Sequence, residues 1–139
     1  MIKLEIHKSI LDIEQGEFVA LYGTSGVGKT SVLNKLSMYD DVCFPSPRGT
    51  SEVNNWAEVI RLMPQSYKVY LFDEPTNYDV PREVRVETIR MTNNLHAQGK
   101  TIIMASHDWG HIEFATRIIE MFLNKTFIEH GSGMFRRLQ

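Results

Sequence analysis

The stretch LYGTSGVGKTSVL, from Leu21 to Leu33, fits the pattern G-x-x-x-x-G-K-[ST] between Gly23 and Thr30. The apolar run FVALY precedes it and a helix-period segment follows, so the pattern lies between a predicted strand and a predicted helix. Glycines allow backbone dihedral angles that other residues avoid. Successive amides and the helix N-terminus then point inward, where they bind phosphate oxygens. The stretch therefore predicts a phosphate-binding loop (P-loop).

The polar side chains of this loop have separate expected roles. Lys29 is expected to reach the β and γ phosphates of a nucleoside triphosphate, and the Thr30 hydroxyl is expected to bind Mg²⁺ directly. The predicted nucleotide-binding residues are Gly23, Thr24, Ser25, Gly26, Val27, Gly28, Lys29, Thr30 and Ser31.

Short apolar runs alternate with helix-period segments along the rest of the chain, which is typical of an α/β protein. The runs expected to form strands of a parallel sheet, buried on both faces, are 18–23, 69–74 and 101–107, with a weaker candidate at 41–44. Strands expected at an antiparallel edge are 2–6, 10–13 and 122–130. Helices are expected from Gly28 to Ser37, from Thr50 or Ser51 to Pro64, from Pro81 to Gly99, and over 109–115.

Two of the predicted strands end in residues that suit phosphate chemistry. The run VYLF is followed by Asp73 and Glu74, and the run TIIMAS is followed by His107. A carboxylate at the C-terminal end of a strand beside the loop can hold Mg²⁺, and its neighbour can act as general base towards water. His107 is expected to point into the crevice where open α/β sheets bind ligands, as a γ-phosphate contact.

The composition indicates one globular domain over residues 1–139. The chain has 139 residues, 42% of them hydrophobic, and a net charge of −2, which gives no general attraction to nucleic acid or acidic membranes. One cysteine, Cys43, excludes an internal disulfide and favours a reducing compartment. No apolar run approaches the roughly 20 residues that span a membrane, and the N-terminus lacks the form of a signal peptide. A cytoplasmic protein without membrane insertion is therefore expected.

The order of these motifs resembles the ATP-binding cassette (ABC) ATPases over most of the chain. LDIEQGEFVALYGTSGVGKTSVLNKL is similar to the strand, Walker A loop and helix of that family, VYLFDEPTN to its Walker B strand, and GKTIIMASHD to its switch strand. IIEMFLNKTFIEHG resembles its terminal hairpin. The resemblance implies a P-loop nucleoside triphosphatase with ATP and Mg²⁺ as ligands. It implies phosphate binding by Lys29, Mg²⁺ binding by Thr30 and Asp73, a catalytic base in Glu74 and a switch in His107.

Several family features are absent from the sequence. The interval between Lys29 and Asp73 is too short for the helical subdomain, and the expected signature position holds 49–53, GTSEV, without paired glycines. No glutamine lies between Gln15 and Gln65, so Ser46 is the nearest substitute for a Mg²⁺-contacting Gln. The segment with the adenine-stacking aromatic is missing, leaving His7 as a weak candidate, and Asp79 lies one position early for the D-loop.

These losses leave three hypotheses. The first is a minimal ABC-type protein that binds Mg-ATP and hydrolyses it slowly or with a protein partner that completes the site. The second is a nucleotide-dependent binding or regulatory module without turnover. The third, a small P-loop kinase, needs an arginine-bearing lid, and the interval before Asp73 offers only Arg48 and Arg61.

Overall fold

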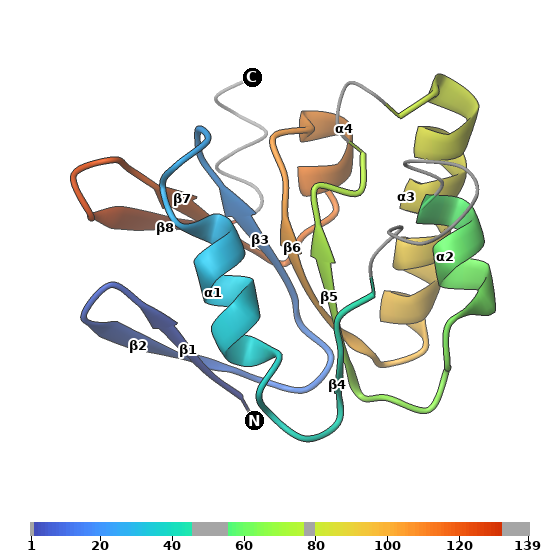
Figure 1. The fold of residues 1–139 in the computed structure, drawn as a ribbon, viewed down its shortest axis with the longest axis horizontal. Helices are drawn as coiled ribbons and strands as arrows, with labels where there is room; N and C mark the ends of the chain where they lie inside the picture. Colours follow the sequence, from blue (N-terminus) through green and yellow to red (C-terminus); the bar gives the residue numbers. More distant parts are fainter. Residues whose placement is uncertain (1, 46–55, 77–79, 132–139) are drawn as a thin grey trace.

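The computed structural model describes residues 2–45, 56–76 and 80–131, and its centre is a six-stranded sheet in the order β4-β5-β6-β3-β7-β8 (Figure 1). The strands are β3 (Phe18–Tyr22), β4 (Val42–Cys43), β5 (Val69–Asp73), β6 (Thr101–Ala105), β7 (Arg117–Met121) and β8 (Phe127–Gly131). Neighbouring strands are parallel except β7 and β8, which are antiparallel. A separate antiparallel pair consists of β1 (Ile2–Ile6) and β2 (Ser9–Ile13). The predicted α/β class, with a mostly parallel sheet and an antiparallel edge, is confirmed.

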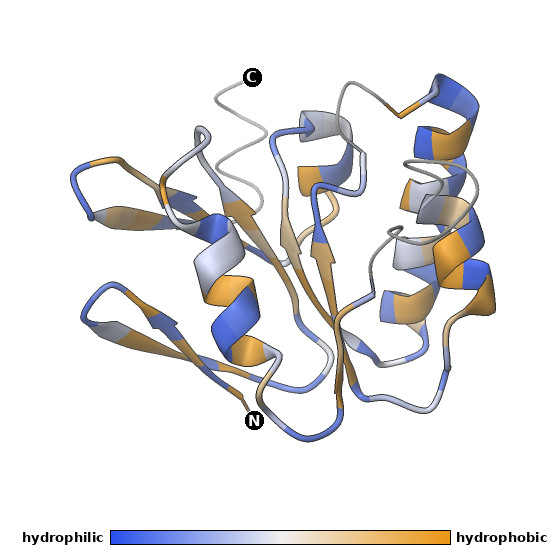
Figure 2. Ribbon diagram, in the orientation of Figure 1, coloured by the Kyte–Doolittle hydropathy of each residue, from blue (hydrophilic) through white to orange (hydrophobic). Residues whose placement is uncertain are grey.

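The sheet is covered on both faces. Helix α1 (Lys29–Leu36) and the β1–β2 pair lie on one side, and helices α2 (Trp56–Leu62) and α3 (Arg82–Ala97) lie on the other (Figure 1). Because strand side chains alternate between faces, Leu71 and Ile103 join the first apolar cluster while Phe72 and Met104 join the second. Figure 2 shows the apolar strands between helices on which apolar and polar residues alternate. This double burial explains the continuous apolar runs in the sequence.

Two predicted boundaries are wrong. The expected strand 122–130 is instead a turn followed by β8, which begins at Phe127. The antiparallel pair of β7 and β8 agrees with the resemblance of 118–131 to a terminal hairpin. The turn is closed by bonds from the amide of Lys125 to the Phe122 carbonyl and from the amide of Phe122 to the Thr126 carbonyl. The expected helix 109–115 is shorter, because α4 (Trp109–Ile112) gives way to a turn. The expected start of the second helix, Thr50 or Ser51, lies outside the described residues.

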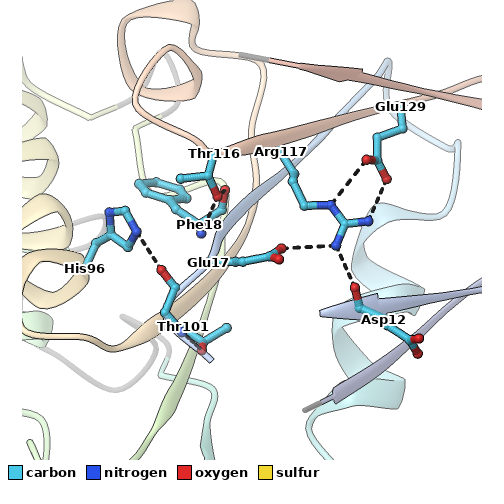
Figure 3. Close-up of polar contacts among 9 residues, drawn as sticks. Asp12, Glu17, Phe18, His96, Thr101, Thr116, Arg117 and Glu129 are labelled. Carbon is cyan, nitrogen blue, oxygen red and sulfur yellow. Dashed lines mark hydrogen bonds and ion pairs between the residues drawn. The ribbon is translucent and has the colours of Figure 1, made fainter. Parts of the chain in front are cut away.

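Arg117, the first residue of β7, joins the β1–β2 pair to the main sheet (Figure 3). Its guanidinium donates to the Asp12 main-chain oxygen at 2.6 Å and to the Glu17 carboxylate at 3.0 Å. It also donates twice to the Glu129 carboxylate of β8, at 3.3 and 2.7 Å. A planar guanidinium suits such forked contacts. Arg117 therefore fixes the base of the β1–β2 hairpin relative to the base of the β7–β8 hairpin.

Candidate phosphate-binding site

The predicted phosphate-binding loop leaves β3 at its C-terminal end and enters α1. Gly28 has φ 100° and occupies the position before the helix, where a side chain would strain the backbone. Gly23 has φ 156°, and a Cβ atom there would lie 2.6 Å from the Met121 carbonyl oxygen. The loop therefore depends on glycine at both ends, for the backbone turn at Gly28 and for close contact with β7 at Gly23.

Lys29 begins α1 and is buried, with 7% of its side chain exposed. Its ammonium donates to the main-chain oxygen of Gly23 and, at 3.4 Å, to that of Thr24. It also lies 3.7 Å from the Glu74 carboxylate. The ammonium is therefore held inside the curve of the loop, next to the carboxylate at the end of β5.

Thr30 and Asp73 meet across the space between α1 and β5. The Thr30 hydroxyl donates to the Asp73 carboxylate over 2.9 Å. Mg²⁺ binds oxygen ligands at about 2.0–2.1 Å in octahedral geometry, which places adjacent ligand oxygens roughly 2.9 Å apart. Mg²⁺ usually takes one or two protein ligands together with phosphates and waters. The two side chains therefore fit adjacent ligands of one Mg²⁺ ion.

Glu74 directly follows β5 and has a strained backbone. Its φ is 53°, in the left-handed region that non-glycine residues rarely adopt. The conformation lets its amide donate to the Ala105 carbonyl at 2.8 Å, where β6 ends. Strain of this kind costs about 1–3 kcal/mol and tends to occur at functional sites. The strain therefore supports a functional role for Glu74.

The Glu74 carboxylate lies 3.0 Å from Nδ1 of His107, which follows β6. Burial raises the pKa of Glu74 from 4.5 to about 7, with Lys29 opposing and Asp73 reinforcing the effect. Burial, followed by the positive charge of Lys29, lowers the pKa of His107, so the imidazole is neutral near pH 7. A carboxylate that titrates near neutral pH is suited to accept a proton from water.

A buried hydrogen-bond chain is centred on His111 of α4. The Thr92 hydroxyl of α3 donates to the Ile89 carbonyl at 2.9 Å, so it can only accept from Nε2 of His111, 2.7 Å away. Because burial lowers the pKa of His111 to about 3, the ring is neutral and carries one proton. Nδ1 must then accept from the Thr76 hydroxyl at 3.3 Å. The chain links α3, α4 and the loop that begins with Glu74.

Comparison with solved structures shows cassette-like folds. The ATP-binding cassette MJ0796, in a dimeric post-hydrolysis state bound to ADP and Pi, has a TM-score of 0.66 and 18% identity, over 88% of each chain. A metal-chelate type ABC transporter in an inward-facing conformation has a TM-score of 0.71 and 14% identity, over 91% of this chain and 76% of the other. No protein-family model matches the chain. Among curated proteins, the macrolide export ATP-binding/permease protein MacB of Bartonella henselae is 31% identical over 90 residues.

The chain has the fold of the ATP-binding cassettes and is similar in sequence to a part of MacB. The match to MacB includes 65% of this chain but only 14% of the relative's length. The structure brings together five of the predicted site residues at one end of the parallel strands: Lys29, Thr30, Asp73, Glu74 and His107. Ser46, segment 49–53 and Asp79 lie outside the described residues, so their expected roles stay predictions.

Sequence reasoning missed two hollows in the surface of the protein. One is a groove of about 850 Å³ between the tips of the β1–β2 and β7–β8 hairpins, lined by His7, Lys8, Ser9, Lys125, Thr126 and Phe127. The other is a pocket of about 290 Å³ beyond Glu74 and His107 that reaches Arg85 of α3.

No helix within the described ranges is long and apolar enough to cross a membrane.

Proposed function

We propose that the chain binds Mg-ATP through its phosphate loop and hydrolyses it, slowly or together with a protein partner. One observation supports this most: Lys29 and His107 lie 3.7 and 3.0 Å from the Glu74 carboxylate, beside the Thr30–Asp73 pair. A phosphate-binding cation, a base and a Mg²⁺-type oxygen pair are thus adjacent. We further propose that residues 1–139 form one domain.

In this proposal the phosphates lie along the loop from Gly23 to Thr30. Lys29 leaves its main-chain acceptors to bind the β and γ phosphates, since charge-assisted bonds to phosphate are stronger than bonds to neutral carbonyls. Thr30 and Asp73 hold the Mg²⁺, which neutralises phosphate charge when it is bound. His107 lies next to the base and contacts the terminal phosphate.

Glu74 has the properties that hydrolysis requires of a base. It accepts a proton from water as the water oxygen bonds to the γ phosphorus and the bond from that phosphorus to the bridging oxygen breaks, leaving ADP and phosphate. The raised pKa favours this proton transfer near neutral pH. The neutral His107 ring, bonded to the carboxylate, orients it without adding a charge.

The nucleoside end of the ligand belongs in the groove between the hairpin tips. The γ phosphate faces Glu74, so the nucleoside extends the other way along the loop. Met121, which packs on Gly23, pairs across the β7–β8 ladder with Phe127 of the groove wall. His7, the candidate of the sequence analysis, lies in the same groove, and its Nε2 is buried without a hydrogen-bond partner. A buried polar atom of this kind is commonly satisfied by a ligand or water.

Two variants test the proposal. Lys29→Ala removes a charged contact to phosphate and should weaken Mg-ATP binding at least ~10-fold, measured by calorimetric titration. Glu74→Gln should retain binding while phosphate release falls ~10²-fold or more. Unchanged binding by Lys29→Ala refutes the loop assignment, and equal turnover by Glu74→Gln transfers the base role to another group such as Asp108.

A second candidate function is a nucleotide-dependent module that binds without turnover. The segment 49–53, which lacks the paired glycines of a cassette signature, favours it. The same phosphate-release assay separates the two functions. Nucleotide binding with no release above the Glu74→Gln background, alone or in a cell extract, supports the module.

A further inference from the structure

The pocket beyond Glu74 shares no lining residue with the hairpin groove. It has a volume of about 290 Å³ and is bounded by the ends of β5 and β6, the first turn of α4 and the first turn of α3. Glu74 and His107 line both this pocket and the candidate hydrolytic site. The pocket therefore opens from the end of the site where the γ phosphate is expected.

Arg85 lines this pocket and has one buried polar atom without a partner. Its Nε is buried and has no hydrogen-bond partner in the part of the chain that the structure describes. Buried polar groups are almost always paired, and an exception points to a bound ion, ligand or water. The side chain comes from α3 and lines the same hollow as the base.

The other charged groups of the pocket already have partners. Asp108 accepts the amide of Gly110 at 3.0 Å at the start of α4. Glu74 lies 3.7 Å from the ammonium of Lys29 and 3.0 Å from His107. Within the described residues Arg85 makes no ion pair with a carboxylate, and its guanidinium matches the geometry of a tetrahedral oxyanion.

We propose that this pocket is an oxyanion site in which Arg85 binds inorganic phosphate. Its source rests on the proposed function: the phosphate cut from ATP beside Glu74 moves into the pocket and is held by Arg85 before it leaves the protein. Phosphate from solution has the same chemistry and reaches the same site. Arg85 makes the pocket a product site distinct from the phosphate loop, because Lys29 takes no part in its lining.

The first experiment measures phosphate binding by the pocket in protein whose phosphate loop is weakened by Lys29→Ala. Inorganic phosphate is titrated into Lys29→Ala protein, followed by ³¹P nuclear magnetic resonance, and the titration is repeated in Lys29→Ala/Arg85→Gln and Lys29→Ala/Arg82→Gln proteins. Arg82 is the matched control, since it is an exposed arginine in the first turn of the same helix. Arg85→Gln should weaken phosphate binding about tenfold or more, and Arg82→Gln should leave it unchanged.

Thermal unfolding guards against a folding defect. Phosphate should raise the unfolding midpoint of Lys29→Ala protein but not of the Arg85→Gln version, since a ligand stabilises only the state that binds it. Arg85→Lys retains the positive charge but lacks the paired N–H donors of a guanidinium. It should bind phosphate with an affinity between those of the Arg85 and Arg85→Gln proteins. Three outcomes overturn the proposal. Phosphate binds equally with and without Arg85, the Arg82→Gln control loses as much affinity as Arg85→Gln, or no saturable binding occurs at a Kd of about 10 mM or tighter.

The second experiment distinguishes the source of the phosphate. Added phosphate should inhibit ATP hydrolysis by the parent protein and inhibit the Arg85→Gln protein about tenfold less strongly. Equal inhibition of the two shows that cleaved phosphate leaves by another route. Absence of hydrolysis in every variant refutes turnover by the chain alone, while the titration in Lys29→Ala protein still decides whether the pocket binds phosphate from solution.

Discussion

Replacing Glu74 with glutamine should stabilise the nucleotide-free protein at alkaline pH. Burial raises the pKa of this carboxyl from 4.5 to about 7, and 22% of its side chain is exposed. Between these two pH values the folded protein retains a proton that the unfolded chain has lost, so the free energy of unfolding falls as the pH rises. At 1.36 kcal/mol for each pH unit, the full loss is about 3 kcal/mol above pH 7. Glutamine resembles the protonated carboxyl and avoids this loss.

Urea unfolding of the parent and the Glu74→Gln protein at a series of pH values measures the difference. It should grow from near zero at about pH 4.5 to about 3 kcal/mol at pH 8. Glu14→Gln, at an exposed carboxylate outside the site, is the matched control and should show no such trend. A Glu74→Gln protein that is no more stable than the parent at pH 8, or a difference that is equal at both pH values, refutes the assignment of a desolvated carboxylate at this position.

Three further outcomes are expected. ATP and GTP should bind with affinities within about tenfold of each other, by competition titration, because the sequence lacks a stacking aromatic before the loop. Thr92→Val should lower the free energy of unfolding by about 1–3 kcal/mol, because Nε2 of buried His111 loses its acceptor. Thr88→Val loses only a bond to the Val84 carbonyl of its own helix and should lower the free energy of unfolding by less. Mg-ATP should not drive tight homodimerisation of Glu74→Gln protein in sedimentation, since segment 49–53 lacks the glycine pair and has an acidic residue; a stable ATP-dependent dimer would contradict this.

The arrangement of the candidate hydrolytic residues could be predicted from sequence because it depends on local patterns at strand ends. The apolar runs that end at Asp73 and Ala105 predict parallel strands, and the carboxyl ends of adjacent parallel strands meet. The loop motif fixes Lys29 and Thr30 relative to β3 and α1. In the sheet, β6 lies between β5 and β3, so the residues that follow these three strands lie near one another.

The hairpin of β7 and β8 could not be delimited in this way. Its turn has no glycine or proline to interrupt the apolar pattern, and the left-handed position is occupied by Lys125 at φ 64°. The turn is stabilised instead by the Asn124 side chain, which accepts the amide of Thr126 at 3.2 Å. A side-chain bond of this kind gives a weaker sequence signal than Gly or Pro.

The pocket at Arg85 depends on tertiary structure alone. Arginine in the first turns of a helix ordinarily indicates a solvated face, and nothing in the pattern of α3 distinguishes Arg85 from Arg82. The difference is tertiary: Arg85 has a buried Nε and lines a pocket together with residues from the ends of β5 and β6 and the start of α4. The same holds for His111, whose two partners come from segments far apart in the sequence.

The separate β1–β2 sheet has a consequence for hydrogen exchange. Within the described strands, β1 and β2 form a ladder only with each other, and apolar packing and the Arg117–Asp12 bond hold them to the rest. A two-stranded hairpin is marginally stable by itself, so its amide protons should exchange with solvent as one unit, before those of β3. A ligand in the groove would bridge His7 at the hairpin tip to Phe127 of β8 and slow that exchange. The amides of the first two strands therefore report whether the groove is occupied.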